Sequence, residues 1–147
     1  MKKLLLILFL IPTFVLAEDF TLVCDGEMRT YRNNKPESVS QETRVIDVKE
    51  TAIRIDGEIY KTETWKSYDG EIGHTTSYRK NDKKILLKRT SFNKEQCWFA
   101  KITQEWEINR ISGIVTSHYK IEDTCGKGTF LFVSNIKAKC EKKDRSF

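Results

Sequence analysis

The chain has 147 residues, with 26 Lys and Arg against 21 Asp and Glu, and its formal net charge is +5 at pH 7. The excess is mild, and both signs are mixed in stretches such as KTETWKSYDGE rather than gathered into a basic run with interleaved aromatic residues. Because nucleic-acid binding needs a clustered positive patch, the composition argues against a nucleic-acid partner. The length is typical of a single domain.

The first residues have the features of an export signal. Lys2-Lys3 precedes the apolar run Leu4 to Ile11, and Val15-Leu16-Ala17 offers small residues for cleavage. This pattern predicts a signal peptide over residues 1–17, followed by a single β domain over residues 18–147. The apolar run is well short of the roughly 20 residues that span a bilayer. We therefore expect no membrane span and a periplasmic or secreted protein.

Beyond this segment the apolar residues alternate with a period of two, which is typical of half-buried β-strands. Turn dipeptides separate the alternating stretches at Asp56-Gly57, Asp69-Gly70 and Asn81-Asp82, and Asp-Gly suits tight hairpin loops. The strands expected before residue 93 lie within 19–24, 40–48, 51–55, 58–65, 71–79 and 83–92. Short connections between them favour an antiparallel up-and-down meander.

The stretch between Cys97 and Cys125 is predicted to form a β-hairpin. From Trp98 to Ile108 the apolar residues occupy mostly even positions, and from Val115 to Ile121 the more apolar positions are odd. Opposed residues in a hairpin have numbers of constant sum, so the two apolar faces coincide when that sum is 221 or 223. The first value makes Asn109 to Ser112 the loop, with Gly113 available for a bulge.

Four cysteines follow the signal segment: Cys24, Cys97, Cys125 and Cys140. In an oxidising compartment they predict two disulfides, and of the three possible connectivities we favour Cys24 with Cys140 and Cys97 with Cys125. Cys24 and Cys140 each share a strand face with apolar residues, so their bridge would join the first strand to the last. The expected fold is thus an all-β domain that closes into a barrel-like, lipocalin-like structure, with a sandwich as the alternative.

Motifs for catalysis and metal binding are missing from the sequence. His74 and His118 lie far apart, and no cysteine pair has the spacing of a zinc site. No nucleophile elbow is present, and CGKGT at 125–129 lacks the long spacing of a phosphate loop. Carboxylates such as Glu105 and Glu107 fall on outward positions, as in a solvated face. We expect no catalytic residue, no metal and no cofactor, and a protein that is not an enzyme.

Inward-facing aromatic and apolar residues are the remaining functional signal. Ile102, Trp106 and Tyr119 are candidates for lining a ligand cavity, or they fill a solid barrel. Arg110, at the hairpin tip, is a candidate partner contact, or it folds back onto the carbonyls of its loop. Phe130 to Val133 is apolar on both faces, which suits a covered strand or a patch for a partner.

These features favour a non-enzymatic binding protein for a small apolar or amphipathic ligand. The alternative is an envelope protein-interaction module or inhibitor that acts through surface strand and loop contacts.

The segments FTLVCDG and INRISG, together with a closing segment that carries a final cysteine, resemble a group of small exported bacterial all-β proteins of unknown function. This resemblance implies export, an all-β fold and a recurrent hairpin loop that contains Arg110. It implies no activity, substrate or cofactor.

Overall fold

The computed structural model describes residues 19–93, 101–123 and 131–143. These residues form ten antiparallel strands in one sheet, with the order β4-β3-β2-β1-β10-β9-β8-β7-β6-β5. All neighbours in this order are also neighbours in sequence except β1 and β10. The strands are β1 Phe20–Arg32, β2 Lys35–Val48, β3 Ala52–Ile55, β4 Glu58–Lys61, β5 Glu63–Lys66, β6 Ile72–Lys80, β7 Lys84–Asn93, β8 Lys101–Asn109, β9 Ile114–Glu122 and β10 Leu131–Lys143. The expected all-β meander is confirmed.

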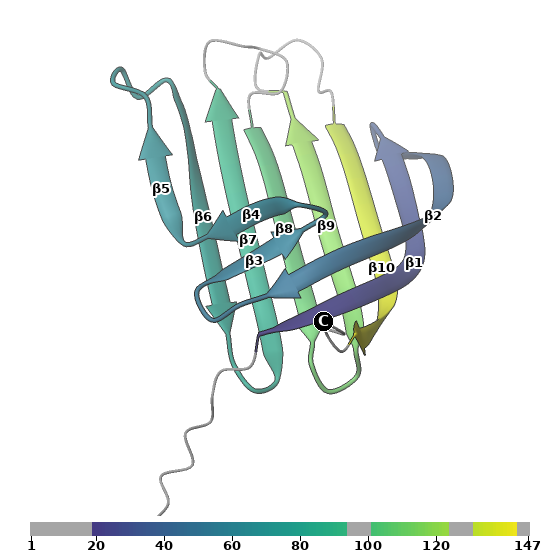
Figure 1. The fold of residues 1–147 in the computed structure, drawn as a ribbon. Helices are drawn as coiled ribbons and strands as arrows, with labels where there is room; N and C mark the ends of the chain where they lie inside the picture. The colour runs from purple at the N-terminus through teal and green to yellow at the C-terminus, as the bar shows by residue number, and fades with distance from the viewer. Residues whose placement is uncertain (1–18, 94–100, 124–130, 144–147) are drawn as a thin grey trace, which may run out of the picture.

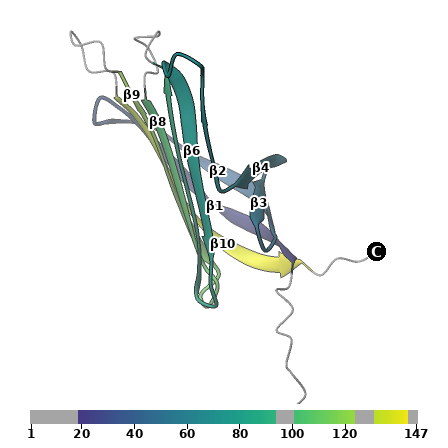
Figure 2. The same ribbon diagram turned by 90° about the vertical axis from the view of Figure 1, so that its left-hand side faces the viewer.

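The sheet curls into a nearly closed barrel. In Figure 1, β3, β4 and the adjoining parts of β1 and β2 cross in front of β6 to β9, and Figure 2 shows them standing off one face of these strands. The two ends of the sheet meet at Thr62, whose hydroxyl accepts from the Tyr78 N–H at 3.0 Å and donates to the Tyr78 carbonyl at 3.2 Å. The strand connection between β4 and β5 therefore ties the sheet ends together.

Glycine at position 26 allows β1 and β10 to lie close together where they bend. Gly26 is directly opposite Ala138 in the register of the two strands. A Cβ at this position would lie 2.2 Å from the carbonyl oxygen of Lys137 and 2.5 Å from the Cβ of Ala138. Any larger residue would push the two strands apart.

Side chains alternate between two faces of the sheet, which we call the inner and outer faces. The inner face holds the core, and along β7 and β8 it receives Ile85, Leu87, Trp106 and Ile108. The largest fully buried side chains are Ile46, Ile53, Ile85, Leu87, Ile108, Val48, Val115 and Cys24. Branched aliphatic residues at every second position thus form strands and core together, because they suit a pleated surface and remove apolar area from water.

The predicted bridge between the first and last strands is confirmed. Cys24 and Cys140 are direct cross-strand partners in β1 and β10, and their sulfurs are bonded. Both residues belong to the core. The second predicted bridge, between Cys97 and Cys125, lies outside the described residues, and so does Phe130.

The β8–β9 hairpin adopts the second of the two expected registers. Trp106 is opposite Ser117, and the last pair before the turn is Asn109 with Ile114. The loop therefore runs from Arg110 to Gly113 and does not begin at Asn109. The Asn109 side-chain oxygen accepts hydrogen bonds from the Ile111 and Ser112 N–H groups at 3.0 and 2.9 Å, and these bonds place the turn one residue later.

The β3–β4 hairpin follows the turn expected from its sequence. Asp56 and Gly57 have φ values of 50° and 92°, as a two-residue loop of this kind requires. Across the part of the chain that the structure describes, we find no helix with the length and hydropathy needed to cross a membrane.

Candidate functional site

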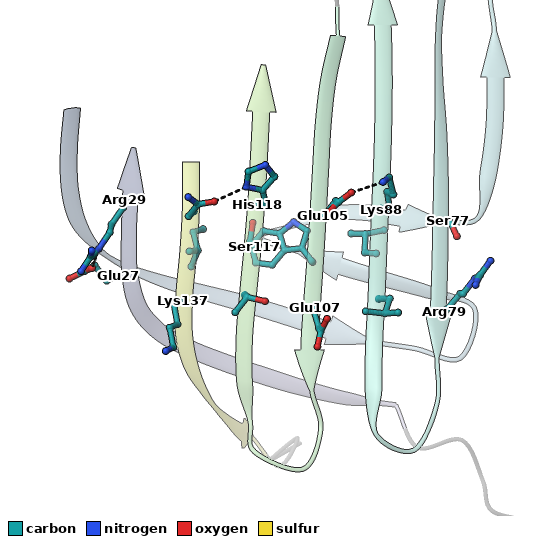
Figure 3. A pocket seen from close by; sticks show the side chains of 16 residues that line it. Glu27, Arg29, Ser77, Arg79, Lys88, Glu105, Glu107, Ser117, His118 and Lys137 are labelled. Carbon is teal, nitrogen blue, oxygen red and sulfur yellow. Dashed lines mark hydrogen bonds and ion pairs between the residues drawn. The ribbon is translucent and has the colours of Figure 1, made fainter. Parts of the chain in front are cut away.

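A trough of about 840 Å³ lies across the outer face of β1, β10, β9, β8, β7 and β6. The outward side chains that line it fall in two neighbouring rows that run across the strands. Successive members of each row are direct cross-strand partners. The first row contains Arg79, Leu86, Glu107, Thr116, Lys137 and Glu27; the second contains Ser77, Lys88, Glu105, His118, Asn135 and Arg29. Figure 3 shows most of these side chains on one face of the sheet.

The carboxylates of the trough are all paired. Lys88 and Glu105 face each other across β7 and β8, with 2.6 Å between Nζ and Oε1, and Lys84 holds Glu107 at the same distance. Glu27 pairs with Arg29 on the same strand, and its carboxylate raises the pKa of the Arg29 guanidinium. These ion pairs are exposed, so each adds little to stability.

Apolar surface in the trough comes from Leu86 and from the long cationic side chains. Leu86 is 40% exposed in the first row. The methylene stems of Lys and Arg also cover apolar ligand surface well, while their charged ends remain in water. The lining is therefore amphipathic.

His118 is oriented by a neighbour in the second row. Its Nδ1 lies 2.7 Å from Oδ1 of Asn135. An amide oxygen only accepts, so Nδ1 donates and the proton-free Nε2 of the neutral ring is left as an acceptor. His118 occupies the outward face, as its position in the alternation indicated, and it can accept a hydrogen bond from a ligand hydroxyl or amide.

The three residues predicted to line a ligand cavity are not gathered in this trough. Trp106 is 5% exposed and belongs to the core, although it also contributes to the floor of the trough. Ile102 and Tyr119 are half-buried on the inner face, where the Tyr119 ring meets Phe132 edge-on at 6.4 Å between centroids. An interior ligand against these residues stays a prediction.

Arg110 is held by neighbouring elements. Its guanidinium donates to the Asn81 carbonyl of the β6–β7 turn at 2.7 Å and lies over the Phe20 ring, 5.5 Å from the centroid. It also lines a small cavity of about 160 Å³ together with Phe20 and Lys142. The side chain thus folds back, but onto the adjacent hairpin and not onto its own loop. A partner contact by Arg110 stays a prediction.

The outer-face residues of the trough were not selected by sequence reasoning, which concentrated on the inward positions. A signal was present in the same alternation, because every second residue of β6 to β10 had to face outward. Knowing which of these residues lie side by side requires the register of each strand pair. In the β8–β9 hairpin the two registers that the pattern left open place different outward side chains opposite each other.

The described residues contain no group of three or more His, Cys, Asp and Glu side chains that could hold a metal ion. No protein-family model, curated protein or solved structure matches this chain.

Proposed function

We propose that this protein is an exported, non-enzymatic binding protein that holds a small amphipathic ligand in the trough. The observation that carries the proposal is the hollow of about 840 Å³ with its mixed lining of paired charges and exposed Leu86. Its volume lies within the range of small-molecule sites. The Cys24–Cys140 disulfide is compatible with a periplasmic or secreted location.

A tryptophan at Thr116 would test the proposal. Thr116 is exposed in the middle of the first row, and the core packs on the other face of its strand. Tryptophan suits a strand, so Thr116→Trp would fill the trough and leave the fold intact. Leu86→Trp is a second blocking variant in the same row. Thr64→Trp is the matched control, because Thr64 is exposed on β5 and does not line the trough.

Native mass spectrometry of protein purified from the envelope of its own host gives the readout. We expect the wild type and Thr64→Trp to retain a small-molecule adduct that both blocking variants lose. Thermal denaturation would confirm that all three variants fold. An adduct retained by both blocking variants, or no adduct on the wild type, would contradict the proposal.

A protein-interaction module or inhibitor is the second candidate function. The specific observation in its favour is the exposed pair of aromatic residues near the sheet edge, Trp65 and Tyr68, which are 51% and 110% exposed. Trp65 lies on β5, which pairs only with β6. By contrast, Leu131 to Val133 are half-buried between β1 and β9. A partner whose affinity falls with Trp65→Ala but not with Thr116→Trp would favour this second function.

A further inference from the structure

Two cations in the trough differ from the others, and this inference rests on the proposed function of the trough. Ion pairs engage Arg29 and Lys88, whereas the described residues provide no hydrogen-bond or ion-pair partner for Arg79 or Lys137. Both of these side chains are exposed. Because Glu27, Glu105 and Glu107 are already paired, the trough has two positive charges without a counter-charge.

Arg79 and Lys137 belong to the same cross-strand row. Between them lie Leu86, Glu107 and Thr116, each the direct partner of the next. Four interstrand steps of about 4.8 Å place the two backbone positions about 19 Å apart. Figure 3 shows Arg79 and Lys137 on opposite sides of the trough.

The side chains between the two cations suit an apolar body. Leu86 is exposed beside Arg79, and Thr116 is small, so neither obstructs a chain that lies along the row. Glu107 is the one carboxylate in this interval of the row, and Lys84 neutralises it at 2.6 Å. The neighbouring row offers the Lys88–Glu105 pair and His118, and neither adds an unpaired negative charge.

We infer that the trough binds an amphipathic dianion, with one anionic group paired to Arg79, the other paired to Lys137, and an apolar body over Leu86. Arg79 offers a planar fork that suits a carboxylate or phosphate, whereas Lys137 acts as a compact point charge. An exposed cation alone binds an anion weakly. Affinity therefore requires both ends and the apolar body at once, and this requirement selects for the length of the ligand.

Isothermal titration calorimetry with α,ω-alkanedioic acids of increasing chain length tests this inference at low ionic strength. The matched monocarboxylic acid and the α,ω-diol serve as comparison ligands. We expect one chain length to bind best, at least about tenfold more tightly than the monocarboxylic acid of that length. Arg79→Gln and Lys137→Gln would each reduce the affinity for the dianion to about that of the monocarboxylic acid.

Arg54→Gln is the matched control, because it removes the same charge from an exposed position on β3 that does not line the trough. Its affinity for the dianion should equal that of the wild type. Thr116→Trp should abolish binding of the dianion.

The possible failures are distinguishable. If the dianion, monocarboxylic acid and diol bind equally and Thr116→Trp removes all three, the trough is a ligand site but the inference is wrong. The inference is also wrong if Arg79→Gln and Lys137→Gln bind the dianion as tightly as Arg54→Gln does, or if no dianion binds the wild type. The proposed function fails separately, when the native adduct survives in both blocking variants.

Discussion

The two faces of β7 and β8 belong to the same few residues but have opposite characters. On the inner face, Ile85, Leu87 and Ile108 are almost completely buried. On the outer face, Lys88 and Glu105 form an exposed ion pair in the trough. Since successive side chains of a strand point to opposite faces, the core and the candidate binding surface share a backbone but no side-chain environment. Substitutions on one face can therefore leave the other nearly unchanged.

The largest effect is expected from removing the inner-face disulfide. Cys24→Ala combined with Cys140→Ala opens a link across a sequence separation of 116 residues, which should lower the free energy of unfolding by about 4 kcal/mol. Urea denaturation measures the loss. Lys88→Gln, which breaks an outer-face ion pair, is the control and should cost less than about 1 kcal/mol. Equal losses for the two variants would remove the distinction between the faces.

A second contrast uses two adjacent leucines. Leu87 is 2% exposed on the inner face, whereas Leu86 is 40% exposed on the outer face. Leu87→Ala should cost about 2 to 5 kcal/mol through the cavity that it leaves, and Leu86→Ala should cost about 0.5 kcal/mol or less. Denaturant unfolding of both variants gives the comparison. A Leu86→Ala loss as large as that of Leu87→Ala would show that the outer face also has a packed core.

The smallest effect concerns tyrosine ionisation on the inner face. Burial raises the pKa values of Tyr60 and Tyr78 to about 12, helped by the Glu58 carboxylate at Tyr60 and by the charge of Glu50 at Tyr78. Their pKa in the unfolded chain is about 10. The neutral form is favoured in the folded protein, so this contribution to stability is fully present below pH 10 and declines as the pH rises from 10 to 12.

Absorbance-detected titration of tyrosinate would check this expectation. Two tyrosines should ionise late in the folded wild type, and Tyr78→Phe should remove one of them. Complete ionisation of the folded protein near pH 10 would contradict the burial of both rings.

Much of the fold was predictable because its causes are local. Alternating apolar residues identified the strand faces, Asp56-Gly57 identified a tight turn, and Cys24 was correctly paired with Cys140. The register of the β8–β9 hairpin was left with two solutions. It was decided by the side-chain oxygen of Asn109, which caps the loop by hydrogen bonds that a hydrophobic pattern does not reveal.

The candidate site was not predictable to the same extent. Ile102 and Tyr119 were correctly placed on the inward face, but the trough lies on the other face. Arg110 was recognised as a loop residue, yet its contact with Asn81 comes from a different hairpin. Long-range contacts of this kind depend on how separate hairpins sit beside one another.

By itself, the sequence determined the strands, most of their turns and which side chains face inward, because side-chain alternation is a property of each strand alone. Only the tertiary structure decided that Arg79 and Lys137 belong to one row, and that the sheet curls so that a hollow forms on its outer face. A cross-strand row requires the register of every intervening strand pair, and curvature requires a close approach such as that of Gly26 to Ala138. Both are collective properties of the sheet that no single segment contains.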